Sequence, residues 1–397
     1  MPVPTGPSPA ATVAVRDATR LALQSEAGLA IVLPSPVAVG AVDFLAAARR
    51  QRVTAVLAQQ AAAIGLSAEV SDGLLEVRRW ARLRSLRQVR SLTEVARVLD
   101  GCGVPAIFFK GPCLAVQTTG DSSARDAGDI DVLVAPEEVA GVVEALERAG
   151  WSRQPGQPTD ERSFGWHYLR WGGCELALDG RLGRVDLHWR LVPARHALPG
   201  FDVLWSRRSE VEVGGAAFAT LGLADALDHS CQHAAKDRWL SLRSLVDVHR
   251  LLRETALLPP RSGAPVEEAT VAVLESTLGL PPGAEGSRAS PRRAASAVRV
   301  ALRAQDEPIR MHRPAGVGTY RAAHYSLASD HGTTNVVRTL AVAVVPPDTF
   351  AGNSARTAPV AVARAVPRRI RRVTLRFLGR VESAAPDRRA PGSAPSP

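Results

Sequence analysis

The most informative run of the sequence is Gly128-Asp129-Ile130-Asp131-Val132-Leu133-Val134, in which two acids precede an entirely apolar end. Successive side chains of a strand point to opposite faces. Asp129 and Asp131 therefore share one face, and Ile130 and Val132 share the other. The pattern predicts a buried strand that presents two carboxylates on the same side.

The two carboxylates suit a divalent metal ion. Their Cα atoms would lie roughly 6.6 Å apart along a strand. Like charges held so close raise each other's pKa unless a cation neutralises them. Mg²⁺, or Mn²⁺ in its place, takes carboxylate oxygens and keeps positions open for water and phosphate. We therefore predict Asp129 and Asp131 as metal ligands; the alternative is a pair that caps a loop or faces solvent.

A glycine turn upstream has the features of a phosphate-binding turn. Residues 104–111 predict a short buried strand that runs into Gly111 and then a helix beginning at Pro112. The glycine lets the backbone approach a phosphate, and the free N–H groups of a helix start favour an anion. Lys110 and Lys236 are the only lysines among 49 basic residues. In so arginine-rich a chain, a lysine can mark a position that needs a compact point charge, which the planar guanidinium of arginine does not provide. The alternative is that each lysine is there by chance.

Four short motifs resemble those of one enzyme superfamily. They read Phe109-Lys110-Gly111, Arg125, Asp129-Ile130-Asp131-Val132-Leu133-Val134 and Val185-Asp186-Leu187-His188-Trp189. The combination is similar to that of the nucleotidyltransferase superfamily typified by DNA polymerase beta, and within it to an uncharacterised bacterial group. The resemblance runs from about residue 100 to 190 and is recognisable to about 250. The chain departs from the superfamily after Gly111, where proline replaces the usual serine or glycine and the interval to the acids is longer.

The resemblance implies a fold and a reaction. The fold is of the α+β class: a small mixed β-sheet core of α/β character, with N-terminal helices and a C-terminal helical region around it. A third acid, here Asp186, joins Asp129 and Asp131 in holding the metal and helps to deprotonate the attacking hydroxyl. The implied substrates are an NTP, such as ATP, and an acceptor hydroxyl, with release of pyrophosphate. Neither the acceptor nor the preferred base follows from the sequence.

Other residues near these motifs receive weaker assignments. Lys110, Gly111 and Arg125 are hypotheses for phosphate binding. His188 shares the face of Asp186 and has two interpretations, a zinc or catalytic role and a hydrogen-bonded structural imidazole.

The predicted helix at 223–236 carries a second polar group. Spacings of four and three put His229, His233 and Lys236 on one helical face. The glutamate of a His-Glu-x-x-His zinc motif is missing. We predict that this face lines the nucleotide or acceptor cleft, with Lys236 reaching a phosphate. The alternative is a packed helix whose polar groups are satisfied by Asp247.

Changes of pattern along the chain predict six segments. They are a poorly structured N-terminal segment (1–40), an N-terminal helical region (41–100), the catalytic core (101–220), a helical subdomain (221–280), a basic C-terminal helical region (281–380) and a disordered tail (381–397). We expect helices at 41–64, 72–100, 112–118, 136–149, 222–257 and 266–279, and strands near residues 105, 130, 165, 175 and 185. The helices at 41–64 and 72–100 are both expected to pack against the sheet, and the second carries a broad apolar stripe: Leu74, Leu75, Val77, Trp80, Leu83, Leu86 and Val89.

The excess of positive over negative charge lies in the C-terminal part. Residues 1–280 carry 30 basic and 32 acidic groups, whereas residues 281–397 carry 19 and 7. The arginine-rich run at 364–377 has two interpretations: a surface for RNA or an anionic membrane, or a terminal helix that docks its apolar side and leaves the arginines solvated. An alternative to the enzyme is therefore a non-catalytic nucleotide- or RNA-binding protein on the same fold.

The remaining features favour a cytoplasmic protein. Residues 1–9 lack the pattern of a secretory signal, and no apolar run is long enough to span a membrane. The four cysteines have no Cys-x-x-Cys spacing, which indicates free thiols rather than a disulfide framework.

Overall fold

A five-stranded mixed sheet carries the motifs of the sequence. The computed structural model describes residues 7–29, 39–125, 128–158, 160–255, 263–306, 332–345, 350 and 367. The strands are β1 (Ala106–Phe109), β2 (Asp129–Val134), β3 (Ser152–Arg153), β4 (Glu175–Gly180) and β5 (Gly183–His188), in the order β1-β2-β5-β4-β3. β2 and β5 are parallel and the other neighbours are antiparallel. The predicted α+β fold with a mixed sheet is confirmed.

One face of this sheet is apolar and packs on helices. Val132 of β2 and Leu187 of β5 are fully buried there, together with Val95 of helix α4 (Ala68–Gly101) and Val142 of helix α6 (Val139–Arg148). A short 3-10 turn, η1 (Pro136–Glu138), leads from β2 into α6. The period-two alternation of the sequence produces this face, because every second residue of β2 and β5 is apolar.

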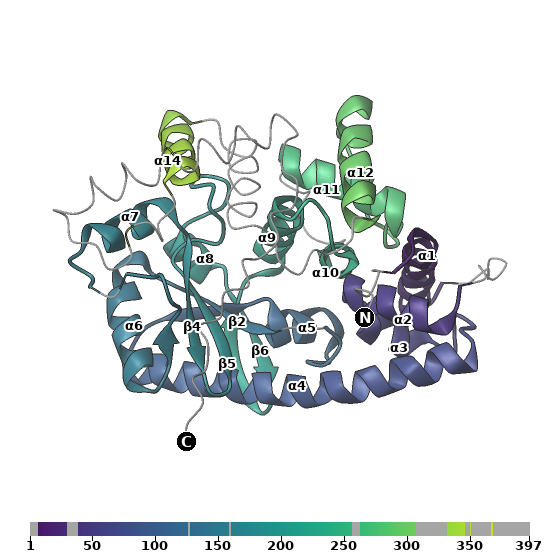
Figure 1. Ribbon diagram of the computed structural model, residues 1–397, viewed down its shortest axis with the longest axis horizontal. Coiled ribbons are helices and arrows are strands. Elements are labelled where there is room, and N and C mark those ends of the chain that lie inside the picture. The colour runs from purple at the N-terminus through teal and green to yellow at the C-terminus, as the bar shows by residue number, and fades with distance from the viewer. Residues whose placement is uncertain are drawn as a thin grey trace, which may run out of the picture.

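Helix α4 runs along the long edge of the molecule, under both the sheet and the N-terminal helices (Figure 1). Ser67 caps its start by accepting a hydrogen bond from the Val70 N–H. The expectation that its whole apolar stripe packs on the sheet is wrong. Leu75, Trp80, Leu83 and Leu86 are 45%, 62%, 51% and 66% exposed. The reason is the side of the helix on which they lie: the buried residues of α4, among them Leu74, Ala81, Ser85 and Leu92, repeat at helical spacing along one side, and the four exposed residues lie on the other sides.

The N-terminal segment is more ordered than the sequence suggests. Helix α1 (Pro9–Glu26) replaces part of the stretch expected to be poorly structured. Ser8 caps it, Pro9 occupies its first turn, and its buried face includes Val15. The single helix expected at 41–64 is two, α2 (Ala41–Gln51) and α3 (Thr54–Gln60), because Arg52 between them has a left-handed backbone with φ of 57°.

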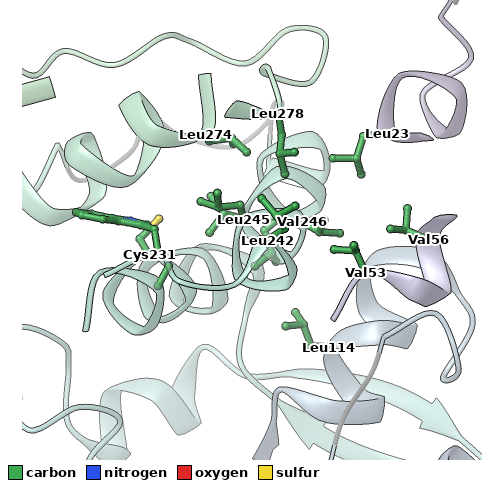
Figure 2. Close-up of a cluster of buried hydrophobic side chains, with 14 of the residues drawn as sticks. Leu23, Val53, Val56, Leu114, Cys231, Leu242, Leu245, Val246, Leu274 and Leu278 are labelled. Atoms are coloured by element: carbon green, nitrogen blue, oxygen red, sulfur yellow. The ribbon is translucent and has the colours of Figure 1, made fainter. Parts of the chain in front are cut away.

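Four helices follow the sheet and build a second core. They are α9 (Leu223–Lys236), α10 (Leu242–Thr255), α11 (Pro265–Thr277) and α12 (Pro291–Asp306). Figure 2 shows side chains of α1, α3, α9 and α11 gathered around Leu242, Leu245 and Val246 of α10. Leu114, from helix α5 (Gly111–Thr119), joins them and connects this core to the sheet.

Several elements differ from the expectation. The strand expected near residue 165 is helix α7 (Phe164–Gly172), which Ser163 caps by accepting from the Trp166 N–H. A hairpin of β6 (Ser209–Val213) and β7 (Ala216–Thr220) was not expected, nor was helix α8 (Phe201–Ser206), whereas helix α14 (Thr333–Val344) lies in the segment predicted to be helical. Gly214 and Gly215 make the hairpin turn with φ of 63° and 81°.

Two further expectations fall where no structure is described. The arginine-rich run at 364–377, apart from residue 367, and the tail at 381–397 lie outside the described residues. Within the described part of the chain, no helix has both the length and the apolar character of a membrane span.

Candidate active site

The second face of the sheet carries the carboxylates. In the parallel pairing of β2 with β5, Asp131 lies directly opposite Asp186, and Asp129 lies opposite Arg184. Directly opposed residues point to the same face. Asp131 is only 5% exposed, whereas Asp129 and Asp186 are partly exposed. The structure therefore brings all three predicted acids to one face of two adjacent strands.

Two cations neutralise Asp131. The Nζ of Lys110 donates to its Oδ1 over 2.6 Å, and the Nε2 of His188 lies 3.3 Å from the same oxygen. Burial alone would raise the pKa of this carboxyl, but Lys110 and His188 outweigh it and hold the pKa far below its usual range. Asp131 is an anion throughout the physiological pH range.

The backbone at Lys110 is strained. Its φ of 59° and ψ of −155° lie in a region that is almost reserved for glycine, and Gly111 follows with φ of 45°. Such a conformation costs about 1–3 kcal/mol and persists only where the surroundings impose it. Here β1 ends at the preceding residue, and the Lys110 carbonyl accepts from the Leu114 N–H over 2.9 Å as α5 begins. The tight turn places the ammonium against Asp131.

Asp186 has a different electrostatic environment. Arg184 donates from Nε to its Oδ1 over 3.0 Å. Burial and the charges of Glu175, Asp131 and Asp129 nevertheless raise its pKa to about 6, with Arg184 opposing the rise. A carboxylate that titrates near neutrality is suited to accept a proton from a hydroxyl.

His188 is a buried cation. It is 1% exposed, its Nδ1 lies 3.3 Å from the Arg190 carbonyl oxygen, and its Nε2 lies 3.2 Å from Glu175 Oε2. Burial would lower its pKa, but Glu175 and Asp131 raise it to about 10. The imidazolium therefore links two carboxylates on the polar face.

Glu175 and Cys174 are site residues that the sequence analysis missed. In the described part of the chain, Cys174, Glu175 and His188 are the group of potential metal ligands whose donor atoms all lie within 4.8 Å of one another. The three predicted aspartates do not gather this closely. The signal that could have identified Glu175 is the β4–β5 hairpin: pairing its two strands around the turn places Glu175 opposite His188.

Helix α9 lies over the polar face. The Phe109 ring packs edge-on against His188 and His229, with centroids 5.0 Å and 5.1 Å apart. Burial, with Lys110 nearby, holds the pKa of His229 well below its usual value, so this histidine is neutral. Burial opposes the charge of Lys236, but Glu175 raises its pKa. The ammonium of Lys236 thus belongs to the electrostatics of the same face.

Asp247 has a partner that the sequence analysis did not consider. Its carboxylate accepts two hydrogen bonds from Arg125 Nε, at 2.9 and 3.1 Å, and one from Nη2 at 3.0 Å. The two side chains, Arg125 and Asp247, are 6% and 9% exposed. Asp247 of α10 therefore pairs with Arg125 in the loop before β2, and this buried bidentate pair links the two segments. Its partner is not the polar side of α9, which was the alternative expected from the sequence. A small cavity lined by Lys110, Arg125, His229, His233 and Asp247 lies beside it.

A family comparison agrees with this geometry. Residues 38–260, more than half of the chain, match a family model described as uncharacterised nucleotidyltransferase. The chain belongs to this nucleotidyltransferase family. The match covers every predicted site residue, from Lys110 to Lys236.

Two further comparisons add little. No curated protein matches the chain. Among solved structures, the crystal structure of the lincosamide antibiotic adenylyltransferase LnuA with lincomycin bound is similar at 17% identity and a TM-score of 0.29, over 41% of this chain and 94% of that one. A similarity this low carries no argument about the substrate of this nucleotidyltransferase.

The polar face has the chemistry expected of a divalent metal site. It offers carboxylate oxygens, the donors that Mg²⁺ prefers. Burial raises the pKa of Asp186, and repulsion from Glu175, Asp131 and Asp129 raises it further, against the opposing charge of Arg184. A bound cation would relieve this repulsion, so the residues fit the group that the family implies.

Proposed function

We propose that this nucleotidyltransferase transfers a nucleoside monophosphate from an NTP, such as ATP, to a hydroxyl of an acceptor, with release of pyrophosphate. Asp129, Asp131 and Asp186 would hold Mg²⁺ or Mn²⁺. The observation that carries the proposal is the register of β2 and β5, which sets Asp131 directly opposite Asp186 on the polar face.

In the proposed reaction, Asp186 takes the proton of the acceptor hydroxyl. The acceptor oxygen then bonds to the α-phosphorus, and the bond from this phosphorus to the bridging oxygen of pyrophosphate breaks. The pKa of about 6 leaves Asp186 mostly ionised at neutral pH and able to accept the proton. A bound divalent ion supplies charge that neutralises the triphosphate and the leaving group.

Cations around the acids are proposed to bind the triphosphate. Lys110 now pairs with Asp131, and it can pair with a phosphate once a metal ion neutralises that carboxylate. The turn at Gly111 exposes the start of α5 to the same group. Arg125 and Lys236 remain proposed phosphate contacts. For Arg125 this requires sharing its guanidinium with Asp247.

The proposed location is the cytoplasm. The four cysteines all lie in the described part of the chain and form no disulfide, as expected in a reducing compartment.

The test is a transfer assay on the full chain. Purified protein is incubated with Mg²⁺, α-labelled NTPs and a cell extract as the source of acceptors, and both labelled product and pyrophosphate are measured. Asp129→Asn and Asp131→Asn should each lower transfer by about 10³-fold or more, because the metal's share of transition-state stabilisation is several kcal/mol. The control Asp72→Asn removes an exposed acid of α4 and should transfer as the wild type does.

Failure of the wild type to bind any NTP in the presence of Mg²⁺ would overturn the proposal. So would full transfer activity in a folded Asp131→Asn protein.

A further inference from the structure

A separate cavity of about 370 Å³ lies beyond the carboxyl end of β5. Its walls come from the chain between Trp189 and Phe201, with Pro136 after β2 and Arg170 of α7. The volume lies in the range of small-molecule sites. None of the acids of the polar face lines it.

Basic side chains dominate the lining. Arg170, Arg190, Arg195 and His196 contribute to it, and no lining residue in the described part of the chain is Asp or Glu. Burial, followed by the nearby charges of Arg338, Arg195 and Arg170, lowers the pKa of Arg190 to about 10. Glu137 and Glu161 act on Arg170 from outside the cavity. The cavity therefore holds positive charge that its own walls do not balance.

Buried donors of the same side chains lack acceptors. The Nε of Arg170, the Nε of Arg190 and the Nε1 of Trp189 make no hydrogen bond with the described residues. Trp189 is only 2% exposed. A buried donor without an acceptor is costly, and a negative charge held in the cavity would offset part of that cost, although these three atoms are closed to direct contact.

The charged groups are held in fixed positions. Nη2 of Arg190 donates to the Gly173 carbonyl oxygen, and Nη2 of Arg170 donates to that of Pro136. The Arg170 guanidinium also lies over the Trp189 ring, 5.1 Å from its centroid. Leu191, Val192 and Phe201 add an apolar wall. The site suits an anionic group attached to an apolar or planar body.

The position of the cavity relates it to the carboxylates. Arg190, in the cavity wall, lies two residues past the end of β5, and its carbonyl oxygen is 3.3 Å from Nδ1 of His188, whose Nε2 contacts Asp131 on the polar face. At about 3.3 Å per residue, the chain from Asp186 to Arg190 spans roughly 13 Å, the length of a small molecule. A single acceptor is therefore long enough to reach from one place to the other.

We propose that this cavity binds a phosphate or carboxylate group of the acceptor and thereby presents the acceptor hydroxyl to Asp186. The anion site stands on the cavity alone. The assignment to the acceptor rests on the proposed function.

The anion site is tested by titration calorimetry on the full chain in EDTA, with phenyl phosphate and benzoate as probes for the two oxyanions. Arg195→Gln removes an exposed cation of the lining and should weaken binding of the preferred probe by about 10-fold, the loss of one charge-assisted hydrogen bond. Arg148→Gln removes an exposed cation of α6 and should leave it unchanged. Asp129→Asn, which disables the proposed metal site, should not weaken it.

Each result decides one part of the proposal. If neither probe binds, or if Arg148→Gln weakens binding as much as Arg195→Gln, the anion site is wrong. Once transfer is observed, Arg195→Gln should raise the KM of the acceptor about 10-fold with the KM of the NTP unchanged. An unchanged acceptor KM overturns the acceptor assignment. If probes bind but no transfer occurs with any NTP, the acceptor assignment falls with the proposed function, and the anion site remains.

Discussion

The two faces of the sheet use the same strands in opposite ways. Val132 and Leu187 are fully buried on one face, while their neighbours Asp131 and Asp186 point to the other, where Asp131 is almost as well buried. Burial stabilises the first face directly, through the hydrophobic effect. On the second face, burial is tolerated only because Lys110 and His188 neutralise Asp131. Burial alone therefore does not distinguish a structural face from a chemical one; the partners of each side chain do.

The strongest test of this comparison is a charge on the wrong face. Val132→Asp would bury a carboxylate among the apolar side chains of α4 and α6, without a cation. We expect a loss of more than about 4 kcal/mol in the free energy of unfolding, which leaves little folded protein. Circular dichroism with urea titration measures it. Asp131→Asn is the matched change on the polar face and should stay folded; equal midpoints for Val132→Asp and wild type would contradict the comparison.

The second test removes one partner of the buried Arg125–Asp247 ion pair beside the polar face. Asp247→Ala leaves the Arg125 guanidinium buried without its partner and should cost about 3–5 kcal/mol of unfolding free energy. The double variant Arg125→Met, Asp247→Leu removes both charges and should recover much of that loss. Urea unfolding of the three proteins gives the comparison. A single variant as stable as the wild type would show that the pair does not tie α10 to the sheet.

A truncated side chain on the apolar face should lower the free energy of unfolding by less than the two charge changes above. Leu187 is fully buried, and Leu187→Ala should lower the free energy of unfolding by about 2–4 kcal/mol through lost transfer energy and residual cavity. The nucleotide affinity of the molecules that stay folded should be unchanged, because the side chain points away from Asp186. Thermal unfolding and NTP binding at low temperature separate the two effects. A loss of NTP affinity without a loss of stability would contradict the placement of Leu187 on the apolar face.

The smallest effect depends on pH. The folded pKa of Asp186, about 6, lies above that of an unfolded aspartate, so ionisation destabilises the folded protein. This penalty is absent below about pH 4, grows up to about pH 6 and is constant above. In EDTA, Asp186→Asn should therefore be more stable than the wild type by about 1–2 kcal/mol at pH 7, with no difference near pH 4. Urea unfolding between pH 4 and 8 measures the gap, and a gap that does not change with pH would refute the assignment.

The polar face was largely predictable from the sequence because its pattern is local. Alternation alone puts Asp129 and Asp131 on one face, and the family motif adds Asp186. Pairing across the chain was not predictable in this way. Arg125 and Asp247 lie 122 residues apart, and nothing local marks them as partners.

Local signals also misled where composition and packing disagree. A strand was expected near residue 165, yet Ser163 caps helix α7 there. The apolar residues of α4 were interpreted as one buried stripe, but the buried side of the helix also uses the small residues Ala81 and Ser85, which a hydrophobic pattern does not mark. Helix α1 was missed because its small alanine- and threonine-rich face is a weak hydrophobic signal.

Helix α4 contributes side chains to both hydrophobic cores of the molecule. Leu74 near its start belongs to the core around α10, and Leu92, Val95 and Leu99 near its end belong to the core under the sheet. Because one continuous helix contributes to both cores, unfolding of either core should destabilise the other. We expect the two cores to unfold in one cooperative transition rather than as independent units.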